Sequence, residues 1–134
     1  MLEIRWQQRF QNFEKAFNRL QHALDVKSDD PLIQAGIIQT FEFTFELAWK
    51  TMKDRLEYEG FDVKAPREVI KQAFQSNYIE NPEPWLEALD KRNLMAHIYD
   101  EEKANEALSL VREKYFYIIR DVYFFLKNEL KASQ

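Results

Sequence analysis

Residues 30–60 read DPLIQAGIIQTFEFTFELAWKTMKDRLEYEG, and this stretch decides the fold. Asp30 can accept hydrogen bonds from the free backbone N–H groups of a first helical turn, and Pro31 has no N–H that needs a partner there. Gly60 is typical of the residue that follows the last turn of a helix. The stretch therefore predicts a long helix from Pro31 to about Glu59.

One face of this predicted helix is apolar along its whole length. Its members recur every three or four residues, at Ile33, Ile37, Phe41, Phe45, Ala48, Met52 and Leu56. Further apolar residues widen the face, namely Ile38, Phe43, Leu47 and Trp49. A helix that is apolar over so much of its circumference must contact more than one neighbour.

The rest of the chain predicts further helices around this one. Residues 4–25 carry a stripe of Trp6, Phe10, Phe13, Phe17, Leu20 and Leu24. A short helix opens at Pro66, with Val69, Ile70, Ala73 and Phe74 as its buried side. Another begins near Pro84 and ends near residues 97–99, and a long last helix carries Ala104, Leu108, Val111, Tyr115, Ile118, Val122 and Phe125.

Three long helices and two short ones predict an all-α fold, an up-and-down bundle of the four-helix type with an additional short helix. A chain of 134 residues has the normal size of one domain, so residues 1–134 are expected to form a single helical bundle. The last helix has large apolar groups on all sides, at residues 115–119 and 123–126. These favour a subunit interface in a two-fold homodimer, and the alternative is a wide core face with scattered exposed tyrosines.

The composition excludes several classes of function. The net charge is −4, whereas a dedicated nucleic-acid binder usually has a basic excess, so any contact with RNA must be local. There is no Cys, which removes disulfides, thiolate chemistry and Cys-ligated metals. The N-terminus has no apolar run of the signal-peptide type, and no stretch approaches the length of a membrane span, which predicts a soluble cytoplasmic protein.

Residues 91–99, KRNLMAHIY, are the candidate site. The planar fork of an arginine such as Arg92 suits a phosphate, and His97 can exchange a proton near neutral pH. This pair could cleave RNA without a metal, with His97 taking a proton from a ribose 2′-hydroxyl, Arg92 stabilising the charge on the phosphate and Asn93 orienting either partner.

Helix geometry and the frequency of this spacing both bear on whether Arg92 and His97 form one site. On a regular helix Arg92 and His97 lie about 140° apart, so either the helix ends before His97 or a symmetry-related chain completes the site. The spacing of the two residues also occurs by chance in many helices. On spacing alone the favoured reading is structural, with His97 capping a helix end and Arg92 pairing with a carboxylate of the bundle.

Glu42 and Glu46 are four residues apart and share one helix face. They could anchor Arg92 or help to bind the metal of an incoming nucleotide, and the structural pairing is favoured. No further carboxylate or histidine has the spacing that would complete a metal site, so no metal is expected in this chain. With only 2 Gly, the chain also cannot form a glycine-rich phosphate loop.

Residues 39–50, QTFEFTFELAWK, and 92–99, RNLMAHIY, resemble the nucleotidyltransferase substrate-binding protein family, a member of the wider HEPN group. The resemblance implies a HEPN-like helical bundle, a homodimer and a separately encoded minimal nucleotidyltransferase as partner. It implies no intrinsic cofactor, and ATP or another nucleoside triphosphate with Mg would be bound together with that partner. The main expected function is therefore the substrate-binding subunit of a two-component system.

The same resemblance implies an alternative function. HEPN ribonucleases carry an Arg, four to six residues, and then a His as a metal-independent motif, which Arg92 and His97 match, with Asn93 after the arginine. In toxin–antitoxin pairs of this group the partner silences the ribonuclease toxin by attaching AMP to a Tyr two residues after the His, and Tyr99 matches it. A third reading is a helical dimer without any site.

Overall fold

A computed structural model describes residues 1–95 and 101–134, and within these residues every regular element is helical. The elements are α1 (Leu2–Asp25), α2 (Pro31–Tyr58), α3 (Pro66–Gln75), α4 (Pro82–Met95), α5 (Glu101–Leu110), a π-helical turn (Val111–Tyr115) and α6 (Phe116–Ala132). The prediction of an all-α bundle is confirmed.

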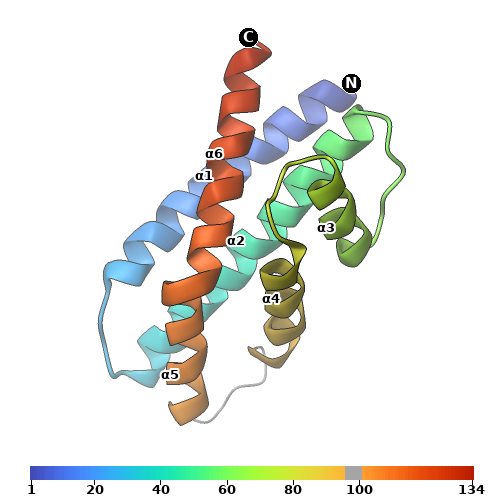
Figure 1. The fold of residues 1–134 in the computed structure, drawn as a ribbon. Helices are drawn as coiled ribbons and strands as arrows, with labels where there is room; N and C mark the ends of the chain where they lie inside the picture. The colour runs from blue at the N-terminus through green and yellow to red at the C-terminus, as the bar shows by residue number, and fades with distance from the viewer. Residues whose placement is uncertain (96–100) are drawn as a thin grey trace.

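The helices run up and down alongside one another (Figure 1). α1 and α2 form a hairpin, α3 and α4 lie together beside α2, and α5 continues through the π-helical turn into α6, so that the two termini lie at the same end. α2 contacts α1, α3, α5 and α6, as its broad apolar face predicts. The helix named in the first prediction is therefore the centre of the bundle.

Both ends of α2 are set by the residues that predicted them. The Asp30 side chain accepts a hydrogen bond from the Leu32 N–H at 2.9 Å. At the other end Gly60 has a φ of +101°, a conformation that favours glycine. The Gly60 N–H donates to the carbonyl of Glu57 at 3.0 Å and the Phe61 N–H to that of Leu56 at 2.9 Å, which together close the helix.

Replacing Asp30 with alanine should lower the free energy of unfolding by about 1 kcal/mol, because a first-turn N–H loses its acceptor. Urea denaturation of the purified chain measures the difference. Asp29→Ala is the matched control, since Asp29 is an exposed neighbour outside the helix. Equal losses for the two variants would show that Asp30 does not act as a cap.

The core contains most of the predicted residues but not all of them. Trp6, Phe10, Phe13, Phe17 and Leu20 of α1 are buried, and so is the α2 face from Ile37 to Leu56. Ile33 and Phe74 are 41% and 44% exposed, so their predicted burial was wrong. Ile33 lies in the first turn of α2, at the end of the bundle, and Phe74 lies about 140° around α3 from Val69, at the edge of a narrow buried stripe.

The last helix changes register at its π-helical turn. Leu108, Val111 and Tyr115 are buried as predicted. Beyond the turn, the buried residues are Ile119, Val122, Tyr123 and Leu126, whereas the predicted Ile118 and Phe125 are only partly buried. A π-helical turn holds one residue more than an α-helical turn, which moves the buried stripe on by one position.

The chain itself covers most of the aromatic surface of α6. Tyr123 stacks on Phe17 with ring centroids 4.4 Å apart and on Phe10 at 5.6 Å. Among the large apolar residues of α6 that the structure describes, only Tyr117 and Phe124 are exposed. As predicted, the chain does not bury all of these side chains itself, although it buries most of them at least in part, and the homodimer remains a prediction.

Candidate functional site

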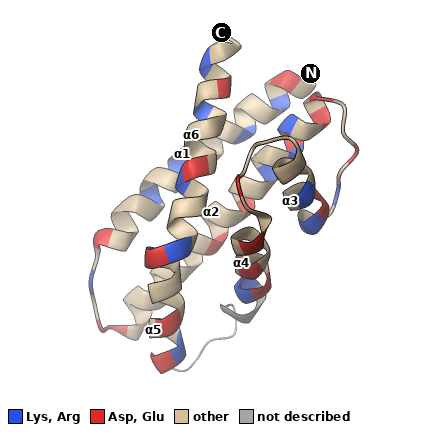
Figure 2. Ribbon diagram, in the orientation of Figure 1, with Lys and Arg blue, Asp and Glu red and all other residues tan. Residues whose placement is uncertain are grey.

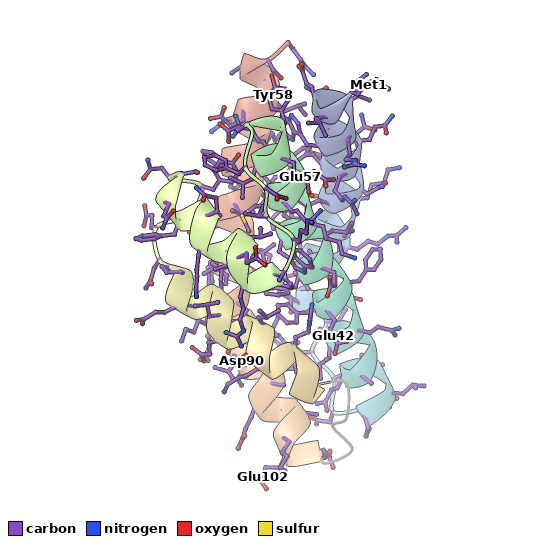
Figure 3. All side chains as sticks on the ribbon, turned by 90° about the vertical axis from the view of Figure 1, so that its right-hand side faces the viewer. Met1, Glu42, Glu57, Tyr58, Asp90 and Glu102 are labelled. Atoms are coloured by element: carbon purple, nitrogen blue, oxygen red, sulfur yellow. The ribbon has the colours of Figure 1, made fainter. Side chains whose placement is uncertain are left out.

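Arg92 of α4 and Glu46 of α2 meet where these two helices pack. The two residues are 46 positions apart, and Nη1 of Arg92 donates a hydrogen bond to Oε1 of Glu46. Figure 3 looks onto this side of the molecule, with α2 between α1 and the pair formed by α3 and α4, and with Glu42 labelled on α2. The Arg92 side chain is 19% exposed, so its guanidinium lies at the edge of the core and within reach of solvent.

The packing of α4 fixes the position of Arg92. Trp85 is 1% exposed and its ring centroid lies 5.5 Å from that of Phe45 on α2. On another side, Glu87 accepts hydrogen bonds from Lys114 at 2.5 Å and from the Tyr115 hydroxyl at 2.9 Å. These two bonds hold the pKa of Glu87 below its ordinary value.

Glu46 is shared among several donors. Its second carboxylate oxygen accepts a hydrogen bond from the Trp49 indole N–H at 2.9 Å and lies 3.7 Å from Nζ of Lys50. The guanidinium carbon of Arg92 also lies 6.0 Å from the ring centroid of Phe45. Glu46 therefore orients Arg92 while an indole and an ammonium orient Glu46. Trp49 in this role was missed, although its position three residues after Glu46 could have indicated it.

Glu42 lies one turn before Glu46 and responds to the same arginine. Burial raises the pKa of Glu42 above its ordinary value of 4.5, and the positive charge of Arg92 opposes this rise. Burial also lowers the pKa of Arg92, and the charge of Glu42 opposes that. Each group thus offsets part of the cost of desolvating the other.

Replacing Glu42 with glutamine should raise the free energy of unfolding at pH 7. Because its folded-state pKa is raised, the contribution of Glu42 to stability is complete below its unfolded pKa and is lost as the pH rises through the folded value. The gain should therefore disappear near pH 4. Urea denaturation of both proteins between pH 4 and 8 measures it, with the exposed Glu106→Gln as control. A loss of stability at pH 7 would contradict the prediction.

The structure places only part of the predicted site. Arg92, Glu42 and Glu46 are brought together across α2 and α4. Asn93 follows Arg92 on α4, and its side chain lies outside the described part of the chain, as do His97 and Tyr99. Among the residues described, no three His, Asp or Glu side chains are grouped so that they could hold a metal ion.

The chemistry available at the contact is anion binding by an arginine that already has a partner. Among the described residues, Glu42 and Glu46 balance the charges of Arg92 and Lys50, two negative groups against two positive ones. A phosphate that approaches the guanidinium competes with Glu46 for it, and if it displaces the carboxylate, Trp49 and Lys50 still provide Glu46 with partners. The arrangement is suited to reversible binding of a phosphate.

The fold and this contact define a class of protein, a helical bundle that presents an arginine between its second and fourth helices. The family described as nucleotidyltransferase substrate binding protein like matches residues 8–128. The chain belongs to this family, as the resemblance of residues 39–50 and 92–99 predicted.

Individual relatives agree with this assignment. A protein of Haemophilus influenzae (strain ATCC 51907 / DSM 11121 / KW20 / Rd) named "Probable ribonuclease HepT" is 38% identical over 80 residues, which cover 56% of this chain and 54% of that protein. The chain thus spans about half the length of this relative.

Two solved structures share the fold. A Thermus thermophilus protein matches with a TM-score of 0.74 and 29% identity, over 82% of this chain and 94% of that one. The Haemophilus influenzae protein HI0074, described as having the fold of a substrate binding domain of a nucleotidyltransferase, matches with a TM-score of 0.68 and 22% identity, over 95% and 99% of the two chains.

Proposed function

We propose that this chain is the substrate-binding subunit of a two-component nucleotidyltransferase. It docks a separately encoded minimal nucleotidyltransferase as a homodimer, and the Arg92 region lies at the cleft that the two proteins share. The catalytic groups for nucleotidyl transfer come from the partner, which also holds the nucleoside triphosphate and its Mg²⁺ jointly with this chain.

The observation that carries this proposal is the family match over residues 8–128, combined with the position of Arg92. The guanidinium is held by a carboxylate from another helix and remains partly exposed, which is the arrangement of a preformed anion-binding group. The fold shared with HI0074, described as that of a nucleotidyltransferase substrate binding domain, supports the same function.

Co-expression with the minimal nucleotidyltransferase of the same genome tests the proposal. The tagged chain should retain the nucleotidyltransferase through affinity purification and gel filtration, and light scattering of the chain alone should give twice its mass of 16.2 kDa. A minimal nucleotidyltransferase from an unrelated pair is the control. Separation of the cognate proteins on gel filtration would overturn the proposal.

A second candidate is a metal-independent ribonuclease toxin, and one specific observation favours it. The relative named "Probable ribonuclease HepT" is 38% identical over the matched part. In this function Arg92 holds the scissile phosphate, His97 transfers the proton, and the partner silences the toxin by attaching AMP to Tyr99. Both functions place a nucleotidyltransferase beside this chain.

Two measurements separate the candidates. If the chain is a ribonuclease, the wild type cleaves RNA without added metal and His97→Ala does not. Incubation with the partner and ATP should then increase the intact mass by whole AMP units, and Tyr99→Phe should abolish the increase. Intact RNA and an unchanged mass, together with a stable complex, would exclude the ribonuclease and support the substrate-binding function.

A further inference from the structure

A second group of cations lies between α1 and α2, outside the contact of Arg92 with Glu46. Here Arg9, Trp49, Lys50, Lys53 and Asp54 line a hollow of about 160 Å³. Lys50 and Lys53 are three residues apart on α2, and Arg9 reaches the hollow from α1. Its lining therefore comes from both helices of the α1–α2 hairpin.

The single carboxylate of this lining is already occupied. Asp54 is 2% exposed and accepts a hydrogen bond from Nε of Arg9 at 2.7 Å. The bond gives the buried carboxylate the charged partner that it needs and fixes the position of the Arg9 side chain within the lining. Both lysines are more exposed than Asp54, and Nζ of Lys50 lies 5.9 Å from the ring centroid of Trp49.

The charge of the lining is positive. Three cations face one carboxylate, which leaves two positive charges in a chain whose net charge is −4. The flanking carboxylates are each divided between cations. Glu57 contacts Lys53 at 2.5 Å and Arg5 at 3.4 Å, and Glu46 contacts both Lys50 and Arg92. Such a concentration of donors in a hollow favours an anion with several acceptor oxygens.

We propose that this hollow binds a phosphate group of a nucleotide or of RNA, as an anion subsite separate from Arg92. Its volume is about half of the roughly 300 Å³ at which pockets for whole small molecules begin, so it fits a phosphate and part of a sugar. The indole of Trp49 forms the apolar wall, and the Arg9, Lys50 and Lys53 side chains donate the hydrogen bonds.

The hollow can act together with the Arg92 contact on one ligand. Lys53 and Glu46 are seven residues apart on α2, which is about 10 Å along a helix axis. Glu42 and Glu57, labelled in Figure 3, mark the lower and upper parts of the same helix. A ligand with more than one phosphate, either a nucleoside triphosphate or an RNA strand, can therefore span both positions. This extension to one ligand rests on the proposed function, whereas the subsite itself does not.

Calorimetric titration with tripolyphosphate and with ATP, and fluorescence anisotropy with a short single-stranded RNA, test the subsite. The double variant Lys50→Gln/Lys53→Gln should bind at least about tenfold more weakly than the wild type. The control Lys64→Gln/Lys71→Gln removes two exposed lysines elsewhere and should change affinity less than about twofold. Lys50→Arg/Lys53→Arg should retain binding, which separates the loss of charge from a loss of folding.

The probes also distinguish the source of the phosphate. Binding of tripolyphosphate and ATP that is weakened in the glutamine variant supports a nucleotide, and binding of RNA alone that is weakened supports RNA. No binding of any probe, or equal losses in the glutamine variant and the control, overturns the subsite. If no probe binds at the subsite but the nucleotidyltransferase complex forms, the subsite is wrong and the proposed function still stands. If the glutamine variant binds the probes more weakly but no complex forms, the subsite stands and the proposed function is wrong.

Discussion

Replacing Trp85 with alanine should lower the free energy of unfolding by about 3–5 kcal/mol, the cost of removing a large aromatic side chain from a packed core. Trp85 is 1% exposed and packs against Phe45 at a tilt across the contact between α4 and α2. The substitution removes a large side chain between these two helices and leaves a cavity in its place. Urea denaturation measures the loss.

Phe74→Ala is the matched control for Trp85→Ala. Both residues are aromatic and both were predicted to face the core, but Phe74 is 44% exposed. Its replacement should cost no more than about 1 kcal/mol, since much of its apolar surface is already in water. Similar losses in the free energy of unfolding for the two variants would show that Trp85 does not stabilise the packing of α4.

Arg92→Ala should raise the KM of the complex with the nucleotidyltransferase by about 10- to 150-fold, because a hydrogen bond to a charged group contributes about 1.5–3 kcal/mol. The physical reason is the geometry of the guanidinium, which Glu46 holds at the edge of the core. Arg92→Lys should recover only part of the activity, because an ammonium cannot form two parallel hydrogen bonds to one phosphate.

Two measurements are needed on the Arg92 variants, the kinetic constants of the complex and the free energy of unfolding. The fold should survive Arg92→Ala, because Glu46 keeps the Trp49 N–H and Lys50 as partners. Arg67→Ala is the control, since Arg67 pairs with Asp90 between α3 and α4 and is 53% exposed. Unchanged activity of Arg92→Ala in a folded complex would remove Arg92 from the site.

Charges of both signs are mixed over the surface of the described part of the chain. Acidic and basic residues are interspersed on every helix, so no helix presents charge of one sign (Figure 2). Binding of an anion must therefore depend on local clusters such as the hollow of Arg9, Lys50 and Lys53.

No helix within the described part of the chain is both long and apolar enough to cross a membrane.

Local sequence patterns predicted the helices because the signals for a helix lie within a few residues of one another. Asp30 and Gly60 set the two ends of α2 through hydrogen bonds with backbone groups within one helical turn. The stripe of α1 needed only the helical period, which is fixed by backbone geometry. The register beyond Tyr115 could not be predicted in this way, since a π-helical turn adds one residue without a distinctive local pattern.

By itself, the sequence determined the all-α class, the bounds of its central helix, the family and the identity of Arg92, Glu42 and Glu46 as candidate site residues. Tertiary structure alone decided that Arg92 bonds to Glu46 and that Arg9 lies beside Lys50 and Lys53. Such contacts join residues on different helices, and the packing of the helices sets their distances. No periodicity within one helix encodes them.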